Sequence, residues 1–485
     1  MGSVAIRRRP SSESTARRLS GLDALFLNVE LSGQPMQIIT LGLLRARTGE
    51  PLTLEYMRQH LAARLGQLPA LRCRVVPVPL GLANSVLVDD PTFDLRQHLR
   101  HEVLPPPGGQ AELDNACAKL VSQRLVRGRP LWRITLIDGL TDGRQAFLLE
   151  VHHALMDGFA LRTTLAQIFS REPPSGSPAP WQPCPMPGRL RLVTGALAHN
   201  AQALAELPAL VSRTRRATVA VRQRQATGAV KVPRAGVDVP PSAINSGSTA
   251  QRRFAQASVP LDDVLAVKDL AGVTVNDVAL ALVGGALREF LHARGALPDR
   301  PLVASIPVGM GESGSTPRAE GNRVVSVPTS LATDVADPWE RLARISAVTT
   351  EAKRCLELQG PELVADWLEC VPPVMAAALA RRRAAAMRRP GKQRVKLDAN
   401  VVVSNLRGPS APWQLGSTVV EEMYLAPPIG GAGVNFLLWD YADRLLFGIL
   451  SFSESIDDPR ELAIYLARSL EELVAAAEFR RVPTT

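Results

Sequence analysis

The feature that most constrains the fold is a pair of predicted strands that leads directly into two histidines. Residues Arg133–Ile137 alternate as strand residues do, and Ala146–Val151 form a second apolar run. The Gly- and Asp-containing segment Asp138–Arg144 separates them, which predicts an antiparallel hairpin. The second strand of this hairpin ends at His152 and His153.

Asp157 and Gly158 follow the histidines closely and precede a predicted amphipathic helix. Successive strand side chains point to opposite faces, so we expect one histidine to face a cleft and the other to pack beneath it. A neutral imidazole takes a proton from a hydroxyl near pH 7. We expect Asp157 to hold the loop or bond an arginine, and Gly158 to allow tight backbone passage. The helix is predicted from the apolar spacing of Leu161, Leu165, Ile168 and Phe169.

A structural pair and a metal site are the alternative interpretations of adjacent histidines. Metal ligands on one helix face are spaced i and i+4, and no further histidine lies near these two, so we expect no metal site. The cysteines are odd in number and scattered, without a CxxC pair, which favours reduced thiols over disulfides or zinc. They are Cys73, Cys117, Cys184, Cys355 and Cys370.

At 485 residues the chain is too long for a single compact core, and its alternating patterns predict a mixed α/β protein of two lobes. Two segments rich in Pro, Ser and Gly, 171–188 and 233–249, separate the halves. We expect a disordered basic segment over 1–19, an N-terminal lobe over 20–170, a linker or crossover with a basic helix over 171–249, and a C-terminal lobe over 250–485.

Regular elements are predicted along both halves. Thr274 is a suitable N-cap for a helix that begins at Val275. Pro208 is expected to kink or interrupt a helical stripe from Leu190 to Val211. The predicted strands are Met36–Leu44, Leu302–Val308, Val324–Thr329, Val401–Ser404 and Leu445–Phe452, and the predicted helices are Leu54–Leu65, Val275–Arg294, Pro338–Leu356 and Pro459–Phe479.

The net charge of +10 is concentrated in three basic segments. Residues 1–18, 189–224 and 381–396 carry +4, +6 and +8, and such segments attract phospholipid headgroups, phosphorylated cofactors or nucleic acid. No run reaches the 18 or so apolar residues of a membrane-spanning helix. The polar residues that follow Arg7–Arg9 do not resemble a signal peptide, so we expect a cytoplasmic protein.

The sequence His152-His153-Ala154-Leu155-Met156-Asp157-Gly158 has the form HHxxxDG, and further motifs accompany it in order. The chain resembles the bacterial wax ester synthase/diacylglycerol acyltransferase family, within the HHxxxDG superfamily of CoA-dependent acyltransferases, from about residue 20 to 480. The accompanying motifs are Leu22-Asp23-Ala24-Leu25-Phe26-Leu27, Gln34-Pro35-Met36, Phe93-Asp94-Leu95 with His98, Leu104-Pro105, Pro130-Leu131-Trp132, Asn276-Asp277, Gly321-Asn322 and Ser404-Asn405-Leu406-Arg407-Gly408-Pro409.

The resemblance implies two chloramphenicol-acetyltransferase-like lobes with mixed β-sheets flanked by helices, and an active-site channel between them. It implies that His153 deprotonates an acceptor hydroxyl, which attacks the thioester of a long-chain acyl-CoA. Diacylglycerol and long-chain alcohols are the expected acceptors. CoA leaves as a thiolate, so no covalent enzyme intermediate and no cofactor are expected. Asn276, which precedes Asp277 at a helix N-terminus, is the first candidate for oxyanion stabilisation, and Asn405 is the second.

Several of these residues have structural alternatives. Pro130, Leu131 and Trp132 are expected to pack where a strand begins, and Asn276 is equally suited to helix capping. The competing functions are an acyltransferase or condensation enzyme with another acceptor, and a non-catalytic protein that binds lipid or nucleic acid. No nucleic-acid-binding motif accompanies the basic segments. Peripheral membrane contact is expected through Val371–Lys396 or Leu190–Val211.

Overall fold

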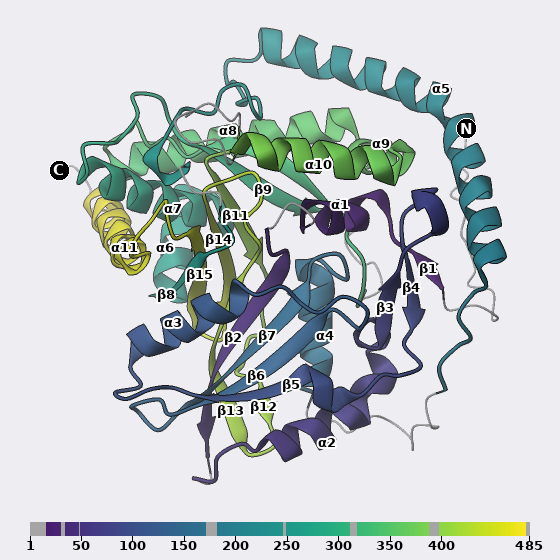
Figure 1. Ribbon diagram of the computed structural model, residues 1–485. Helices are drawn as coiled ribbons and strands as arrows, with labels where there is room; N and C mark the ends of the chain where they lie inside the picture. The colour runs from purple at the N-terminus through teal and green to yellow at the C-terminus, as the bar shows by residue number, and fades with distance from the viewer. Residues whose placement is uncertain are drawn as a thin grey trace.

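Two six-stranded sheets with helices packed around them form the framework of the protein (Figure 1). The computed structural model describes residues 16–30, 34–47, 49–170, 182–245, 249–310, 318–387 and 397–481, without the side chains of 383–387 and 481. A smaller three-stranded sheet, in the order β1-β4-β3, lies beside them. Its strands are Arg17–Arg18, Val86–Asp89 and Cys73–Val76.

The first large sheet carries the histidine strand at its centre. Its order is β12-β13-β2-β7-β6-β5, antiparallel throughout except for the parallel pair β5 and β6. The predicted hairpin is therefore confirmed as β6 and β7. The strands are β2 (Gln37–Ala46), β5 (Leu99–Val103), β6 (Trp132–Asp138), β7 (Gln145–His152), β12 (Gln414–Leu415) and β13 (Thr418–Ala426).

The second large sheet contains most of the C-terminal strands. Its order is β10-β9-β11-β14-β15-β8, and β11 runs parallel to both of its neighbours. All four strands predicted for this half are present, with ends shifted by at most two residues. The strands are β8 (Arg252–Pro260), β9 (Val303–Gly309), β10 (Val324–Ser330), β11 (Val401–Leu406), β14 (Val434–Tyr441) and β15 (Arg444–Phe452).

Helices pack their apolar faces against these sheets. Helix α7 is almost wholly buried, and it packs against α6, α8 and α11 beside the second sheet. Thr274 caps α7, as predicted, by accepting a hydrogen bond from the Asp277 amide. The helices are α1 (Gly21–Glu30), α2 (Leu54–Arg64), α3 (Gln110–Val121), α4 (Gly158–Ile168), α5 (Arg189–Thr227), α6 (Leu261–Ala271), α7 (Val275–His292), α8 (Pro338–Gln359), α9 (Leu363–Cys370), α10 (Pro373–Met387) and α11 (Arg460–Arg481).

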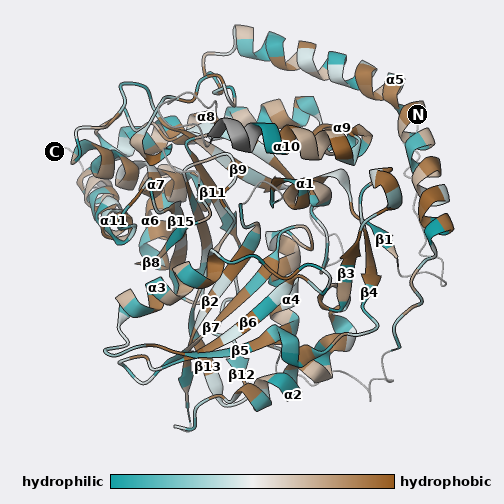
Figure 2. Cartoon of the chain, in the orientation of Figure 1, coloured by the Kyte–Doolittle hydropathy of each residue, from teal (hydrophilic) through white to brown (hydrophobic). Residues whose placement is uncertain are grey.

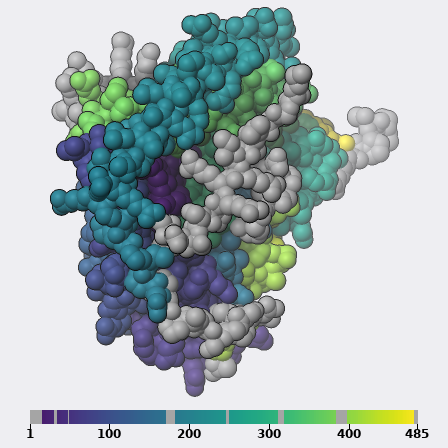
Figure 3. Space-filling view, turned by 90° about the vertical axis from the view of Figure 1, so that its right-hand side faces the viewer, coloured from purple at the N-terminus to yellow at the C-terminus, as the bar shows by residue number. Residues whose placement is uncertain are grey.

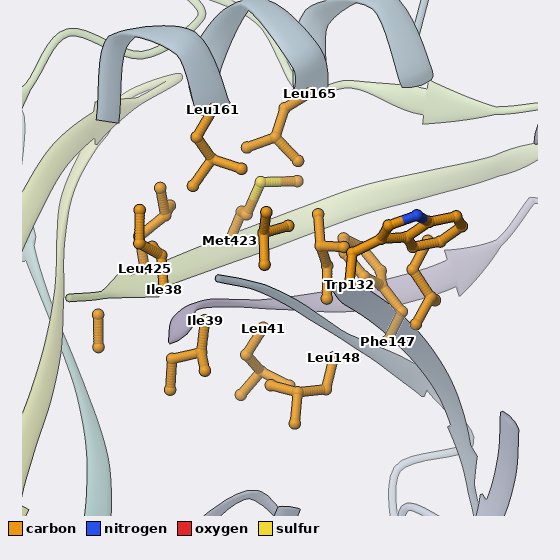
Figure 4. Close-up of a cluster of buried hydrophobic side chains, with 14 of the residues drawn as sticks. Ile38, Ile39, Leu41, Trp132, Phe147, Leu148, Leu161, Leu165, Met423 and Leu425 are labelled. Carbon is orange, nitrogen blue, oxygen red and sulfur yellow. The ribbon is translucent and has the colours of Figure 1, made fainter. Parts of the chain in front are cut away.

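Each large sheet has its own hydrophobic core. In the first, side chains of β2, β7 and β13 form one cluster with those of α4. Figure 4 shows Met423 on the side of the sheet that faces Leu161 and Leu165 of α4, and Leu41 and Leu148 on the opposite side. The second is built from β8, β9, β11, β14 and β15 with α6, α7 and α11. Two separate cores account for a chain of this length, since single cores stop growing at about 250–300 residues.

The chain division expected from the sequence differs from the structure at two places. Strands β12 and β13 belong by sequence to the second half, yet β13 pairs with β2 over Thr418–Ala426 and so extends the first sheet. Within 1–19, residues 16–19 are ordered, because β1 pairs with β4 and Leu19 is fully buried. The rest of that predicted disordered segment lies outside the described residues.

Helix α5 connects the two halves and runs over the outside of the molecule, where Figure 3 shows it as a teal ridge. It continues through Pro208 without interruption and bends along its length (Figure 1). Its buried residues are Leu192, Ala196, Leu210 and Ala217. Three leucines of the predicted stripe are exposed instead: Leu190, Leu197 and Leu204.

Among the described helices, none alone has the length and apolar character to cross a membrane. Two sharply bent pairs meet both criteria, α6 with α7 and α9 with the first part of α10. The first pair contributes to the second core. The second pair exposes Val364, Val374, Met375 and Leu379.

Candidate active site

The two histidines lie on a turn that two neighbouring backbones hold in place. The amide of His152 donates to the carbonyl of Leu131 at 2.9 Å, and the amide of His153 donates to that of Met36 at 2.8 Å. Leu131 precedes β6 and Met36 precedes β2, the strands on either side of β7. Backbone hydrogen bonds to the first sheet are therefore sufficient to hold the turn, without any side chain.

His152 is fully buried and faces the interior. Its Nδ1 accepts a hydrogen bond from the Ala154 amide at 3.0 Å, and its Nε2 lies 3.4 Å from Glu30 Oε1. Burial raises the pKa of Glu30, but His152 and Arg127 outweigh it and leave that pKa below its usual value. These contacts make His152 a packing residue beneath the turn.

His153 points the other way, toward α1 and the second half of the chain. Its ring stacks on Phe26, and its Nδ1 lies 2.9 Å from Asn322 Oδ1. Burial lowers the pKa of His153 to about 4, against weaker opposing effects of a bond to its own backbone, of Asp157 and of Asn322. The imidazole is therefore neutral at pH 7, because its pKa lies well below that pH.

The partner of His153 determines which ring nitrogen carries the proton. The amide nitrogen of Asn322 donates to the His153 carbonyl at 2.7 Å and to Asp23 Oδ1 at 2.8 Å, so its oxygen is the atom that faces the ring. An amide oxygen only accepts, which requires the proton to be on Nδ1 of His153. The lone pair is then on Nε2, the nitrogen available to take a proton.

Asp157 links the histidine turn to the segment 318–323 of the second half. Its Oδ1 caps α4 through the Ala160 amide at 3.0 Å. Its Oδ2 accepts from Arg318 Nη2 at 2.6 Å and from the Arg323 amide at 2.8 Å. Both oxygens are occupied by these bonds, which is the arrangement of a residue that orients a loop.

Backbone hydrogen bonds extend the same contact. The Gly321 amide donates to the Leu155 carbonyl at 2.6 Å, and the Asp157 amide donates to the Gly321 carbonyl at 3.2 Å. Gly321 has φ of +76°, a conformation that favours glycine. The histidine turn and segment 318–323 thus form a short parallel bridge between the two halves.

Gly158 gives room for a residue of the C-terminal motif. A Cβ atom at Gly158 would stand 2.8 Å from a side-chain carbon of Leu406. On β11, Val401 and Val403 pack into the second core, and alternation places Ser404 and Leu406 on the opposite face. Ser404 therefore lies on the strand face whose Leu406 contacts Gly158, and Asn405 lies on the core-facing side.

The Pro130-Leu131-Trp132 segment supports the histidine strand from below. All three residues are buried. Trp132 donates from Nε1 to the Leu71 carbonyl at 2.7 Å and stacks on His98, which itself bonds the Trp132 carbonyl. Together with the bond from His152 to Leu131, these contacts place the segment where β6 begins.

Asn276 and Asp277 lie apart from the histidine turn, in the first turn of α7. Asp277 is buried, and its carboxylate accepts from the Thr274 amide at 3.0 Å and from Thr349 Oγ1 at 2.6 Å. Because α7 packs against α6, α8 and α11, its capped end belongs to the helical layer of the second sheet. Among the described contacts, none joins Asn276 to His153, so the position of Asn276 gives its expected oxyanion role no support.

The sequence assigned no role to Phe26 and Asn322, which contact His153, or to Asp23, which bonds Asn322. Each lies in a motif noted for its resemblance, Leu22–Leu27 or Gly321-Asn322. Asp23 and Phe26 are three residues apart in α1, so they share one helix face. Membership in a motif was the available signal that these residues have a function. Only the fold shows that Leu22–Leu27 and Gly321-Asn322 meet beside His153.

Two family models match the chain. The wax ester synthase/diacylglycerol acyltransferase catalytic domain matches residues 19–279, and the WS/DGAT C-terminal domain matches residues 320–474. A Mycobacterium tuberculosis protein named as a putative diacylglycerol O-acyltransferase is 31% identical over 95% of this chain and 96% of its own length. A second one from that organism is 32% identical over 96% and 99%.

Solved structures agree with this match. A wax ester synthase/diacylglycerol acyltransferase from Marinobacter aquaeolei VT8 is 28% identical, with a TM-score of 0.64 over 95% of this chain and 100% of that one. The first condensation domain of the CDA synthetase is similar in fold, with 17% identity and a TM-score of 0.55 over 96% and 97%. The predicted fold class is confirmed: two chloramphenicol-acetyltransferase-like lobes with mixed β-sheets flanked by helices.

Proposed function

Because the chain belongs to the wax ester synthase/diacylglycerol acyltransferase family, we propose that it transfers a long-chain acyl group from acyl-CoA to diacylglycerol, forming triacylglycerol, and that long-chain alcohols are a second class of acceptor. Membership makes the protein an acyltransferase. The observation that carries the proposed mechanism is the bond between His153 Nδ1 and Asn322 Oδ1, which leaves the lone pair on Nε2.

His153 is the proposed general base. As the acceptor hydroxyl attacks the thioester carbonyl, its proton moves to Nε2. The tetrahedral intermediate then collapses, the carbon–sulfur bond breaks, and the imidazolium returns the proton to the CoA thiolate. A histidine with a pKa of about 4 gives up this proton readily, since a free thiol has a pKa of about 8.5. The balance needs no cofactor, because acyl-CoA is consumed as a substrate.

The other motif residues act on His153 indirectly in this mechanism. His152 and the Pro130-Leu131-Trp132 segment support the strand that carries it. Asp157 holds the histidine turn against segment 318–323, and Gly158 admits Leu406 beside it. These residues are therefore proposed as positioning residues, and their substitution should lower kcat through the geometry of His153.

Oxyanion stabilisation requires a hydrogen-bond donor beside the thioester carbonyl. Ser404 is the preferred candidate, because it is buried on the β11 face that also carries Leu406 against Gly158. Asn405 is next to it on the opposite face, and Asn276 lies in the layer of α7. Alanine substitutions of Ser404, Asn405 and Asn276 distinguish which of them stabilises the oxyanion.

Contact with a membrane or lipid droplet is the proposed route to such apolar acceptors. In α10 the side chains of Met375 and Leu379 are exposed one turn apart, and Figure 2 shows brown residues over α9 and α10. Arg382 lies two turns from Met375, on the same helix face, and is exposed. An exposed apolar face that ends in arginine suits an anionic lipid surface. The other arginines of this predicted segment, beyond Arg382, lie outside the described side chains.

The function is tested by measuring CoA release from palmitoyl-CoA with dioleoylglycerol, hexadecanol, a hydrophilic alcohol, an amine or no acceptor. We expect acceptor-dependent release that His153→Ala abolishes and that His101→Ala retains, since His101 is an exposed residue of β5 bonded to Asp138. The ester product is identified by thin-layer chromatography. Release that His153→Ala leaves intact would contradict the proposed base, and release only with a hydrophilic alcohol or an amine would contradict the proposed acceptors.

A further inference from the structure

Asp23 is a buried carboxylate that contacts the partner of His153 and not His153 itself. It is only 1% exposed. Its Oδ1 accepts from the backbone amide of Asn322 at 2.9 Å and from its side-chain amide at 2.8 Å. Its Oδ2 accepts from the Ser20 amide at 3.1 Å and from Arg17 Nη1 at 3.3 Å. A buried group with this many donors holds a defined orientation.

The Asn322 side chain can adopt only one of its two amide orientations in these surroundings. Both hydrogens of its Nδ2 have acceptors, Asp23 Oδ1 and the His153 carbonyl. Rotation of the amide by 180° would turn its oxygen toward those two oxygens and leave both hydrogens without them. The carboxylate of Asp23, which only accepts when ionised, therefore sets which end of the amide faces the ring.

We propose that Asp23 is a positioning residue that selects the Nδ1–H tautomer of His153 through Asn322. If the amide reversed, its NH₂ would face Nδ1 and favour the proton on Nε2, against the bond between the ring and the backbone of His153 itself, and the base would lose its lone pair to that extent. Asp23 thus acts on a nitrogen that it does not touch. This inference rests on the proposed role of His153, and it assigns a role to the aspartate of the Leu22–Leu27 segment.

The tautomer is measured directly by two-bond ¹H–¹⁵N NMR of protein labelled at histidine, independently of activity. We expect His153 to show the Nδ1–H pattern at pH 7. His152 supplies an internal contrast, because its Nδ1 accepts from Ala154 and so requires the Nε2–H form. His153→Gln identifies the His153 signals among the seven histidines. An Nε2–H pattern for His153 in the wild-type protein would overturn the proposal without any variant.

The link through Asn322 is tested by a double-substitution cycle. We expect Asp23→Asn to lower kcat by about 10²-fold with KM within threefold, because tautomer selection affects the chemical step more than binding. In an Asn322→Ala background the same substitution should change kcat by less than about threefold. Equal effects in both backgrounds would show that Asp23 acts by another route.

Asp114→Asn is the matched control. Asp114 is also a buried carboxylate, in α3, where it bonds Gln110 and Gln256. We expect it to leave the His153 tautomer unchanged. If Asp23→Asn does not fold, the wild-type tautomer and the Asn322→Ala variant decide the question, since loss of the Nδ1–H preference in that variant is required. A correct tautomer in a protein without acyltransferase activity would contradict the proposed function and leave the positioning role intact.

Discussion

The imidazole of His153 lies flat on the phenyl ring of Phe26, with ring centroids 3.9 Å apart and an angle of 8° between the planes. Phe26 comes from α1, one turn after Asp23, so a single helix face supplies both the stacking surface and the carboxylate that holds Asn322. The ring also keeps water from one side of the imidazole. This contributes to the burial that lowers the pKa of His153.

Replacing Phe26 by alanine should therefore affect both the position and the pKa of His153. We expect kcat to fall about tenfold and the acid limb of the pH–rate profile to move upward, because hydration favours the charged imidazolium. The measurement is kcat/KM against pH from 3.5 to 8, a range that includes the His153 pKa of about 4. Phe93→Leu, which removes the ring stacked on His98, is the control. An unchanged acid limb in Phe26→Ala would argue against desolvation by Phe26.

The depressed pKa of His153 also predicts a pH dependence of stability. The unfolded histidine, with a pKa of about 6.5, binds a proton more readily than the folded one, so stability decreases as the pH falls from 6.5 toward 4. Between pH 8 and 5 this group should remove about 2 kcal/mol from the free energy of unfolding. Urea unfolding at both pH values should show this decrease in the wild type and a smaller one in His153→Gln. If the wild type and His153→Gln lose the same unfolding free energy, the loss at low pH comes from groups other than His153.

Asp157→Asn should weaken the contact between the two halves. It removes the charge that pairs with Arg318 while keeping an oxygen to cap α4. We expect a loss of about 1–3 kcal/mol in the free energy of unfolding and a decrease in kcat, since the turn that carries His153 loses its anchor. Asp337→Asn, at the exposed N-cap of α8, is the control for loss of charge at a cap. Full kcat in a destabilised Asp157→Asn would show that the anchor serves folding alone.

Ser404→Ala should reduce kcat by about 10²-fold with little change in KM, as expected for a donor used mainly in the transition state. Asn405→Ala and Asn276→Ala should each change kcat by less than about threefold, because one lies on the other face of β11 and the other in the layer of α7. Steady-state kinetics of the three variants provides the comparison. A larger loss in either asparagine variant would transfer the oxyanion assignment to that residue.

The double substitution Met375→Asp and Leu379→Asp should abolish binding to vesicles that contain phosphatidylglycerol, since it places charge on the exposed face of α10. Arg381→Glu with Arg382→Glu should weaken binding most at low salt. Vesicle flotation measures both. Ile464→Asp, at an exposed apolar position of α11, is the control. If the α10 substitutions leave flotation unchanged, α10 does not take part in membrane binding.

Local patterns predicted the secondary structure around the histidines. The alternation of Arg133–Ile137 and the Thr274 cap indicated elements that the structure contains, because these signals depend on neighbouring residues. The pairing of β13 with β2 joins Thr418–Ala426 to Gln37–Ala46, a long-range contact that no local pattern records. The sequence assigned no role to Asn322 for the same reason, because 169 residues separate it from the His153 ring that it contacts.

The exposed leucines of α5 show a different limit. Periodicity identified Leu190, Leu197 and Leu204 as one stripe, and such a stripe ordinarily packs inward. In the structure, α5 buries another face: Leu192 and Ala196 pack against the three-stranded sheet, and Leu210 and Ala217 pack against α9. Spacing predicts which residues share a face, but the tertiary contacts decide which face is covered.

The bridge between the histidine turn and segment 318–323 has a consequence for synthesis on the ribosome. When the first 170 residues have emerged, His153 is present but Asn322 and its tautomer preference are not, and β13 is still to be added to the sheet. A chain that lacks segment 318–323 thus has no Asn322 to orient the His153 ring. The surroundings of His153 are complete only after segment 318–323 and β13 have docked on the first half of the chain.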